Sequence, residues 1–319
     1  MTEDPNNPPK ETTRLNIPEI TLEESLEAEV DIFYHSLHNQ YRPWQRKLIL
    51  SFRDFRPLKE SLEAMPAKDE AEEKRILSEF LKQCRDRNKD QIEPFISRSR
   101  QEVSNKSGEA LKELAQLMDY NWPENFPGYK VVPVLLPFNP FGKNIFYYSI
   151  LKITQGVDQK DLLEVAIHEI SHMVFFEILE RLRLSSNNFS GPKNIPIDYL
   201  KEILAPVLMN QPPLRRLLDL SRYPEGYTGN PDLGPMFVTV GNSGERTQIS
   251  RYFQQLYERM RYQEHKTFPE IVGAMVKIIM PLEAELLKRR DLWNEYQHKI
   301  FKNQALLDRH SEPMRITEL

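Results

Sequence analysis

The alternation of apolar and polar residues predicts a chain that is mostly helical. Between residues 22 and 118, segments rich in Glu, Lys and Arg carry apolar residues three or four positions apart, as at Leu77 and Leu81, which is the spacing of one face of an α-helix. The segment from Asp161 to Leu179 is far more apolar, and only a few polar residues interrupt it. We expect this segment to be a helix whose polar groups need partners in the interior.

Other runs have the composition of β-strands. Residues 129–136 and 144–153 are rich in β-branched and aromatic side chains, and a segment containing Pro, Asn and Gly separates them, which predicts two strands. A short run at 236–240, MFVTV, predicts a third strand. Helical patterning follows, and we expect three helices over 247–262, 269–289 and 292–307.

Short polar residues indicate where the central helices begin. Asp158 precedes the apolar helix over 161–179 and is a candidate N-cap. A second, shorter apolar helix is expected within residues 197–206, after a loop that contains Gly, Pro and Asn. Asp198 is the predicted N-cap of this second helix.

Length and composition restrict the class of protein. A chain of 319 residues can form about two domains with a large core. Its formal net charge is −4, without a basic or acidic block, so nothing favours a nucleic-acid partner. We find no secretory signal and no span that would cross a membrane. Cys84 is the single cysteine and cannot form an internal disulfide, so we expect a cytoplasmic protein.

His168, Glu169 and His172 form the one motif that specifies a chemistry. In the stretch HEISH the two His are four positions apart. A helix turns by about 100° per residue, so both imidazoles lie on one face and can reach a single ion. Glu169 then lies beside that ion, where its carboxylate can accept a proton from a zinc-bound water whose pKa is lowered to roughly 7.

A catalytic zinc site needs a third protein ligand and one open position. In the metzincin arrangement a Gly and a third His follow within the next turns, but Phe175 and Ile178 occupy those positions. His265, His298 and His310 are distant and lie in polar helical stretches. A carboxylate is therefore the better candidate for the third ligand.

The motif resembles that of the gluzincins, the thermolysin-like zinc peptidases. The resemblance covers residues 129–206 and is specific at the HExxH motif. In gluzincins the third ligand is a Glu on a second helix, and Glu202 has that placement with apolar residues after it. The Asn-Glu pair of thermolysin-like enzymes is absent, because Lys201 precedes Glu202. Glu177 and Glu180 are expected to turn away from the metal face.

The resemblance implies an α+β fold that is mostly helical. We expect a zincin-like metallopeptidase core with a small sheet beside the HExxH helix and with helical N- and C-terminal regions. The expected divisions are a disordered segment 1–18, a helical region 19–120 and a zincin-like domain 121–319. The strand at 144–153 is the candidate sheet edge to which an extended peptide substrate would add, and an interior strand packed under the helix is the alternative.

A gluzincin also needs a donor that stabilises the oxyanion of the transition state. Tyr223 and Tyr227 are candidates, because they lie in a Pro- and Gly-rich loop after the Glu202 helix. The same loop could act as a lid over the substrate. Tyr252, Tyr257 and His265 are alternative donors.

The sequence thus predicts a zinc-dependent peptidase with Zn²⁺ held by His168, His172 and Glu202. Its expected partners are peptide or protein substrates, with no nucleic acid and no membrane, and the sequence makes no prediction of oligomeric state. Two alternatives stay open: a catalytically inactive zincin-fold scaffold, and a metal-dependent hydrolase of a non-peptide amide. The intact Glu169 favours an active enzyme.

Overall fold

The computed structural model describes residues 15–38, 45, 47–48, 51, 69–157, 159–184, 194–241, 244–296 and 299–316. Asp158, His298 and most of the predicted disordered segment, residues 1–14, lie outside the described residues. The chain is mostly helical with small sheets, which confirms the α+β class.

The N-terminal part is helical, as predicted, but it also contains a strand. The helices whose bounds are described there are α1 (Leu26–His38), α4 (Glu70–Arg87) and α5 (Lys89–Leu117). The side chain of Asp69 caps α4 by accepting a hydrogen bond from the backbone N–H of Ala71. Leu77 and Leu81 are fully buried on the inner face of α4. The unpredicted strand is β1 (Ile20–Leu22).

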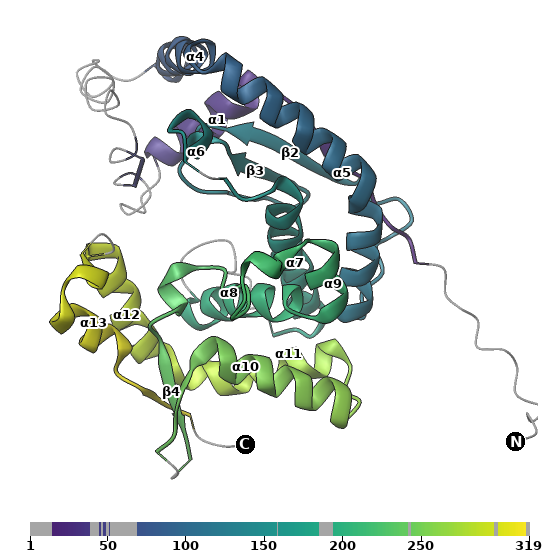
Figure 1. Ribbon diagram of the computed structural model, residues 1–319, viewed down its shortest axis with the longest axis vertical. Coiled ribbons are helices and arrows are strands. Elements are labelled where there is room, and N and C mark those ends of the chain that lie inside the picture. The colour runs from purple at the N-terminus through teal and green to yellow at the C-terminus, as the bar shows by residue number, and fades with distance from the viewer. Residues whose placement is uncertain are drawn as a thin grey trace, which may run out of the picture.

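The first sheet is parallel and has the order β1-β2-β3. Its strands β2 and β3 are labelled in Figure 1. Both predicted strands are confirmed in shorter form, as β2 (Tyr129–Val134) and β3 (Ile145–Ser149). Ile20 pairs with Tyr129, and Val131 pairs with Phe146. The strand predicted over 144–153 ends early because a short helix, α6 (Leu151–Thr154), begins there.

Two helices that pack together follow the sheet, α7 (Leu162–Arg181) and α8 (Ile195–Met209). Every residue of α7 from Leu162 to Phe175 is buried, which confirms the predicted interior helix. Asp161 is the N-cap residue of α7. The predicted cap Asp198 is wrong, because α8 begins one turn earlier and Asn194 accepts the capping hydrogen bond from the N–H of Ile197.

The C-terminal part contains a second small sheet of order β5-β4-β6. The predicted strand at 236–240 is confirmed as β4 (Phe237–Val240). The helix predicted over 269–289 is interrupted at Pro281, since proline lacks the N–H that a continuous helix needs. The elements are α9 (Pro212–Leu217), η1 (Leu220–Arg222), η2 (Pro231–Leu233), β5 (Arg246–Gln248), α10 (Ile249–Glu258), η3 (Arg259–Gln263), α11 (Phe268–Ile279), η4 (Met280–Leu282), α12 (Glu283–Tyr296), η5 (Ile300–Lys302), α13 (Gln304–Ser311) and β6 (Met314–Ile316).

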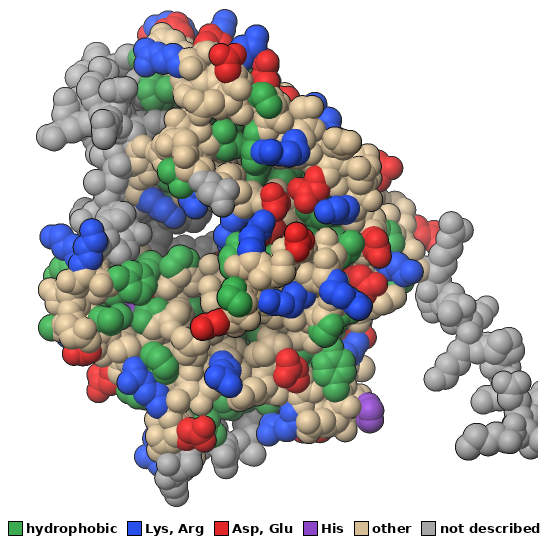
Figure 2. Space-filling view, viewed as in Figure 1, with side chains coloured by type: hydrophobic (Ala, Val, Ile, Leu, Met, Phe, Trp, Pro, Cys, Tyr) green, Lys and Arg blue, Asp and Glu red, His purple; other side chains and the backbone are tan. Residues whose placement is uncertain are grey.

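One cluster of buried apolar residues includes side chains from both sides of residue 120. Helix α5 packs against α7, and β1 pairs with β2 across the predicted boundary. Figure 2 shows a hollow in one face of the molecule, between the part that carries α6 and β3 and the part that carries α8. Among the described residues, no helix is both long and apolar enough to cross a membrane.

Candidate metal centre

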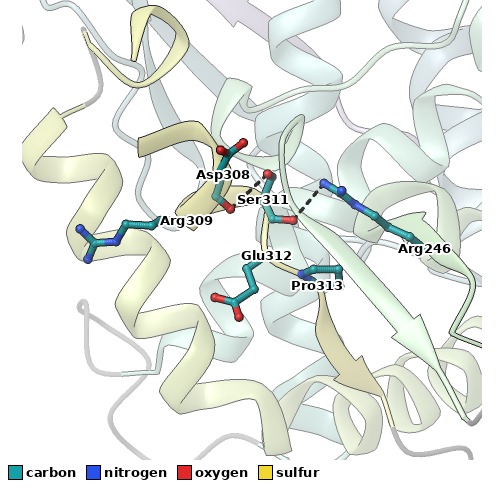
Figure 3. Close-up of a pocket in the computed structure, with 6 residues that line it drawn as sticks. All are labelled: Arg246, Asp308, Arg309, Ser311, Glu312 and Pro313. Atoms are coloured by element: carbon teal, nitrogen blue, oxygen red, sulfur yellow. Dashed lines mark hydrogen bonds between the residues drawn. The ribbon is translucent and has the colours of Figure 1, made fainter. Parts of the chain in front are cut away.

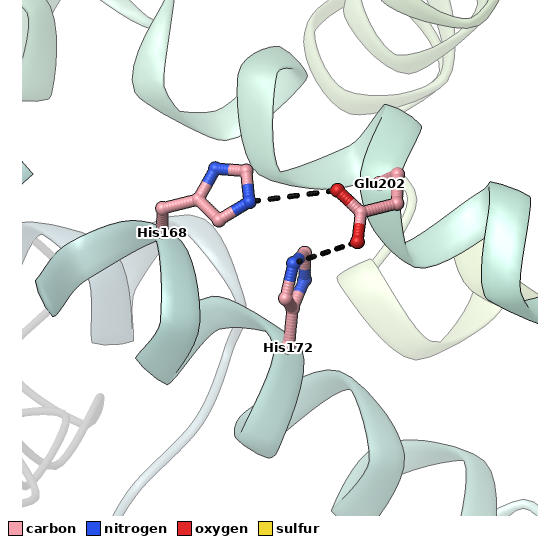
Figure 4. A group of neighbouring side chains, drawn as sticks. All are labelled: His168, His172 and Glu202. Atoms are coloured by element: carbon pink, nitrogen blue, oxygen red, sulfur yellow. Dashed lines mark ion pairs between the residues drawn. The ribbon is translucent and has the colours of Figure 1, made fainter. Parts of the chain in front are cut away.

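The structure brings His168, His172 and Glu202 together at the contact between α7 and α8 (Figure 4). The two imidazoles project from adjacent turns of α7, with their ring centroids 4.5 Å apart. Oε2 of Glu202 lies 3.7 Å from Nε2 of His168, and its Oε1 lies 3.6 Å from Nε2 of His172. The three residues that the sequence selected as ligands therefore meet at one point. His168, His172 and Glu202 are called the triad below.

The geometry and the donor set fit a zinc ion. Ligand atoms about 2.0–2.1 Å from a tetrahedral ion stand roughly 3.4 Å from one another. Here one ligand atom from each of the three residues lies within 4.8 Å of the others, and each Nε2 is 3.6 or 3.7 Å from a different carboxylate oxygen of Glu202. Neither ring nitrogen of the buried His172 has a hydrogen-bond partner in the described part of the chain. A buried nitrogen without a partner is costly, and a metal at this point would supply one to Nε2. Two imidazoles and a carboxylate suit zinc well.

Burial and the neighbouring charges leave His172 and Glu202 in the forms that bind a cation. Burial lowers the pKa of His172 well below its usual value, so its imidazole is neutral. Burial alone would raise the pKa of Glu202, but the neighbouring positive charge of Lys201 holds that pKa well below the usual value. Nζ of Lys201 lies 2.6 Å from Oε1 of Glu202.

Glu169 is the carboxylate that accompanies this cluster. It is buried, and desolvation raises its pKa to about 7, with Glu202 adding to the rise and His168 opposing it. A hydrogen bond from the side chain of Asn139 favours the ionised form. Oδ1 of Asn139 also accepts the backbone N–H of Ser149 at 2.8 Å, so one amide connects β3 to Glu169.

The outer edge of β3 does not present the free hydrogen-bonding groups that substrate addition requires. β3 is an edge strand of its sheet, as expected. However, the N–H of Tyr147 donates to the carbonyl of Pro140 at 2.8 Å, and the N–H of Gly142 donates to the carbonyl of Ile145 at 2.7 Å. Residues 139–142 already cover that edge, which argues against the addition of a peptide to β3. This covering segment also lies at the triad, since the rings of Phe141 and His172 are 5.7 Å apart.

Tyr227 contacts the triad from a different side than an oxyanion donor would. Its hydroxyl lies 3.4 Å from Nδ1 of His168, whereas Nε2 of the same ring faces Glu202. The two ring nitrogens point in divergent directions, so this hydroxyl lies behind the imidazole. Tyr223 packs against Tyr227, and its own hydroxyl donates to Glu164 at 3.4 Å.

The loop that carries both Tyr residues is anchored, which argues against the predicted lid. The side chain of Asn210 accepts the N–H of Tyr227 at 2.7 Å and donates to its carbonyl at 2.8 Å. Arg215 donates to the carbonyl of Tyr223 at 2.6 Å. At Gly229, with φ of +65°, an added Cβ would lie 2.9 Å from Pro206 and 3.4 Å from Cε1 of His168. The backbone thus passes close to Cε1 of the imidazole.

The other residues considered from sequence lie elsewhere. The hydroxyl of Tyr257 donates to the carbonyl of Leu117 at 3.3 Å, and His265 is exposed. His310 is buried, with Nε2 2.8 Å from Oδ1 of Asp232. Glu180 is exposed, as expected for a residue that turns away from the triad. The remaining candidates have separate contacts: Glu177 accepts a hydrogen bond from Tyr120, and the ring of Tyr252 packs on Phe253.

Sequence reasoning missed three residues that shape the site. Asn139 lies in the connection after β2, with an apolar residue before it and a proline after it. The only sign in the sequence that it belongs to the site was that it is an isolated amide side chain there. Asn210 lies one residue beyond α8, where an Asn is an ordinary C-cap. Lys160 donates to the Tyr227 hydroxyl at 2.9 Å, and no spacing rule relates these two residues.

A separate shallow pocket lies at the C-terminal sheet (Figure 3). Its lining comes from β5, α13 and the residues after α13, and not from α7 or α8. Arg246 donates to the carbonyl of Ser311 across it at 3.1 Å. It shares no residue with the triad.

A scan against models of protein families, a search of curated proteins and a search of solved structures each found no match. The assignment of a function therefore depends on the residues of this chain and their arrangement.

Proposed function

We propose that the chain is a zinc-dependent peptidase of gluzincin type, with a zincin-like core. The observation that carries the proposal is the convergence of His168, His172 and Glu202 from two helices, with Glu169 buried beside them. Three protein ligands and one open position are the arrangement of a catalytic zinc rather than a structural one. A bound zinc ion would acidify a water molecule and polarise the carbonyl of the scissile peptide bond.

The residues of the chain have distinct roles in this proposal. The imidazoles of His168 and His172 and the carboxylate of Glu202 hold the ion. Glu169 accepts the proton of the attacking water and passes it to the leaving amine. In the metal-free site burial raises the pKa of Glu169 to about 7, and a bound cation would favour the ionised carboxylate that acts as a base. Asn139 orients the carboxylate of Glu169 through its hydrogen bond.

Hydrolysis of a peptide library by the parent protein and by Glu169→Gln tests the proposal. We expect the variant to retain zinc and to lose at least 100-fold in rate, as removal of a general base does. Glu180→Gln, on the same helix but exposed, is the control and should cleave like the parent. A parent that binds zinc yet cleaves no peptide would contradict the peptidase and favour a scaffold or a hydrolase of other amides. Equal rates for Glu169→Gln and the parent would exclude Glu169 as the base.

A further inference from the structure

We propose that Tyr227 is a positioning residue for the His168 imidazole, and that Lys160 and Asn210 fix Tyr227 in place. This inference rests on the metal centre of the proposed function. It assigns a role to the face of His168 that points away from Glu202.

The contact between Tyr227 and His168 is buried. The hydroxyl lies 3.4 Å from Nδ1, and the exposed fractions of Tyr227 and His168 are 4% and 9%. A neutral imidazole that binds a metal through Nε2 carries its proton on Nδ1. That buried N–H needs an acceptor, and the phenolic oxygen of Tyr227 is the group in position to accept it.

Lys160 holds the hydroxyl from the other side. Its Nζ lies 2.9 Å from the Tyr227 oxygen and 4.3 Å from the centre of the ring. An ammonium group can only donate, so the tyrosine oxygen accepts from Lys160. Nζ of Lys160 also pairs with Glu164 at 3.3 Å, and Glu164 is 1% exposed. A chain of polar contacts thus connects Glu164, Lys160, Tyr227 and His168.

Asn210 fixes the backbone of the same residue. Its amide makes a pair of hydrogen bonds with the N–H and the carbonyl of Tyr227, at 2.7 and 2.8 Å. Asn210 follows α8 directly, and α8 carries Glu202. Tyr227, the partner of His168, is therefore held by a residue at the end of the helix that supplies the third ligand. The Tyr227 hydroxyl and the Glu202 carboxylate are thereby fixed relative to each other.

The outer partner of a metal-bound His fixes the ring orientation and the tautomer, and its loss typically weakens metal binding by about 10- to 100-fold. Phe at position 227 would keep the packing but leave Nδ1–H of a ligating His168 without an acceptor. Lys160→Met would keep the length of the side chain and release the hydroxyl. Both substitutions are expected to weaken metal binding, because both disturb the hydrogen bond that positions His168 as a ligand.

The test is the zinc dissociation constant, measured by competition with a chromogenic chelator, for the parent and for Tyr227→Phe. Tyr129→Phe is the matched control, because it also removes a buried hydroxyl, one that accepts a hydrogen bond from Trp122 at 2.7 Å. We expect Tyr227→Phe to bind zinc at least tenfold more weakly and Tyr129→Phe to bind like the parent. Urea unfolding of the metal-free proteins separates weaker binding from a general loss of stability.

The possible results are distinct. Equal zinc affinity for Tyr227→Phe and Tyr129→Phe would overturn the role of Tyr227 and leave the metal centre intact. If Tyr227→Phe fails to fold, Lys160→Met replaces it, and unchanged affinity in that variant overturns the proposal. A parent that binds no zinc would overturn the metal centre and this inference together.

Discussion

The ammonium group of Lys201 lies 2.6 Å from a carboxylate oxygen of Glu202, its neighbour in sequence and the third residue of the triad. Only 15% of the Lys201 side chain and 22% of the Glu202 side chain is exposed. Asp198 and Glu169 also act on Lys201 electrostatically. In the metal-free chain, Lys201 is thus a positive charge that compensates buried carboxylates at this site.

Lys201→Met should therefore make stability more dependent on zinc. The Lys201–Glu202 pair is partly buried, so loss of Lys201 should cost less than the roughly 3 kcal/mol of a fully buried pair. The metal-free variant should still melt at a lower temperature than the parent. Zinc carries the positive charge that the variant lacks, and we expect it to raise the melting temperature by more in the variant than in the parent. Thermal unfolding with and without zinc measures both effects. Lys277→Met, an exposed lysine on α11, is the control, and an equal zinc-induced shift in all three proteins would contradict this role of Lys201.

Asn139→Ala should slow hydrolysis without removing zinc. The substitution deletes the hydrogen bond to Glu169 and frees the N–H of Ser149. A misoriented general base should cost roughly tenfold in kcat/KM, equivalent to about 1.4 kcal/mol. Steady-state kinetics at full zinc loading give the ratio. Asn144→Ala, at the other end of the same connection, removes only a 3.3 Å contact with the Gly128 carbonyl and should behave like the parent. Equal rates for the two variants would show that Asn139 does not orient Glu169.

Gly229→Ala should disturb the metal centre more than an equivalent strain elsewhere. Gly229 and Gly244 have nearly the same φ, +65° and +67°, so alanine at either position costs about 1 kcal/mol in backbone strain. Only at Gly229 does an added Cβ meet other atoms, Pro206 at 2.9 Å and His168 at 3.4 Å. We expect Gly229→Ala to lose both stability and zinc affinity, and Gly244→Ala to lose stability alone. Chemical unfolding and chelator competition measure the two quantities, and similar zinc affinity in both variants would mean that the loop does not control the position of His168.

The parts of the site that depend on local periodicity could be predicted from sequence. His168, Glu169 and His172 share one helix, so the helical repeat alone places both imidazoles on one face. Glu202 came from the resemblance to gluzincins, and the structure places it at the two imidazoles. Nothing in the spacing of the chain specifies the distance of 30 residues between His172 and Glu202.

The parts that depend on contacts between distant segments could not be predicted. β1 pairs with β2 across more than 100 residues, and three residues are too few to show a strand pattern. Residues 139–142 cover the edge of β3 because the chain turns after them, so that the carbonyl of Pro140 accepts a hydrogen bond from the N–H of Tyr147. Tyr227 was a candidate oxyanion donor from its loop alone, but the contact of its hydroxyl with Nδ1 of His168 depends on Asn210 and Lys160, which are 17 and 67 residues away in sequence.

The central claim is that Glu202 completes a zinc site with His168 and His172. Elemental analysis of bound metal per chain in the parent, Glu202→Ala and Glu180→Ala tests it most directly. We predict close to one zinc per chain in the parent and in Glu180→Ala, whose carboxylate is exposed on the outer side of α7. Glu202→Ala should contain far less, because two imidazoles alone hold zinc weakly. No zinc in the parent after resupply, or full zinc in Glu202→Ala, would contradict the account.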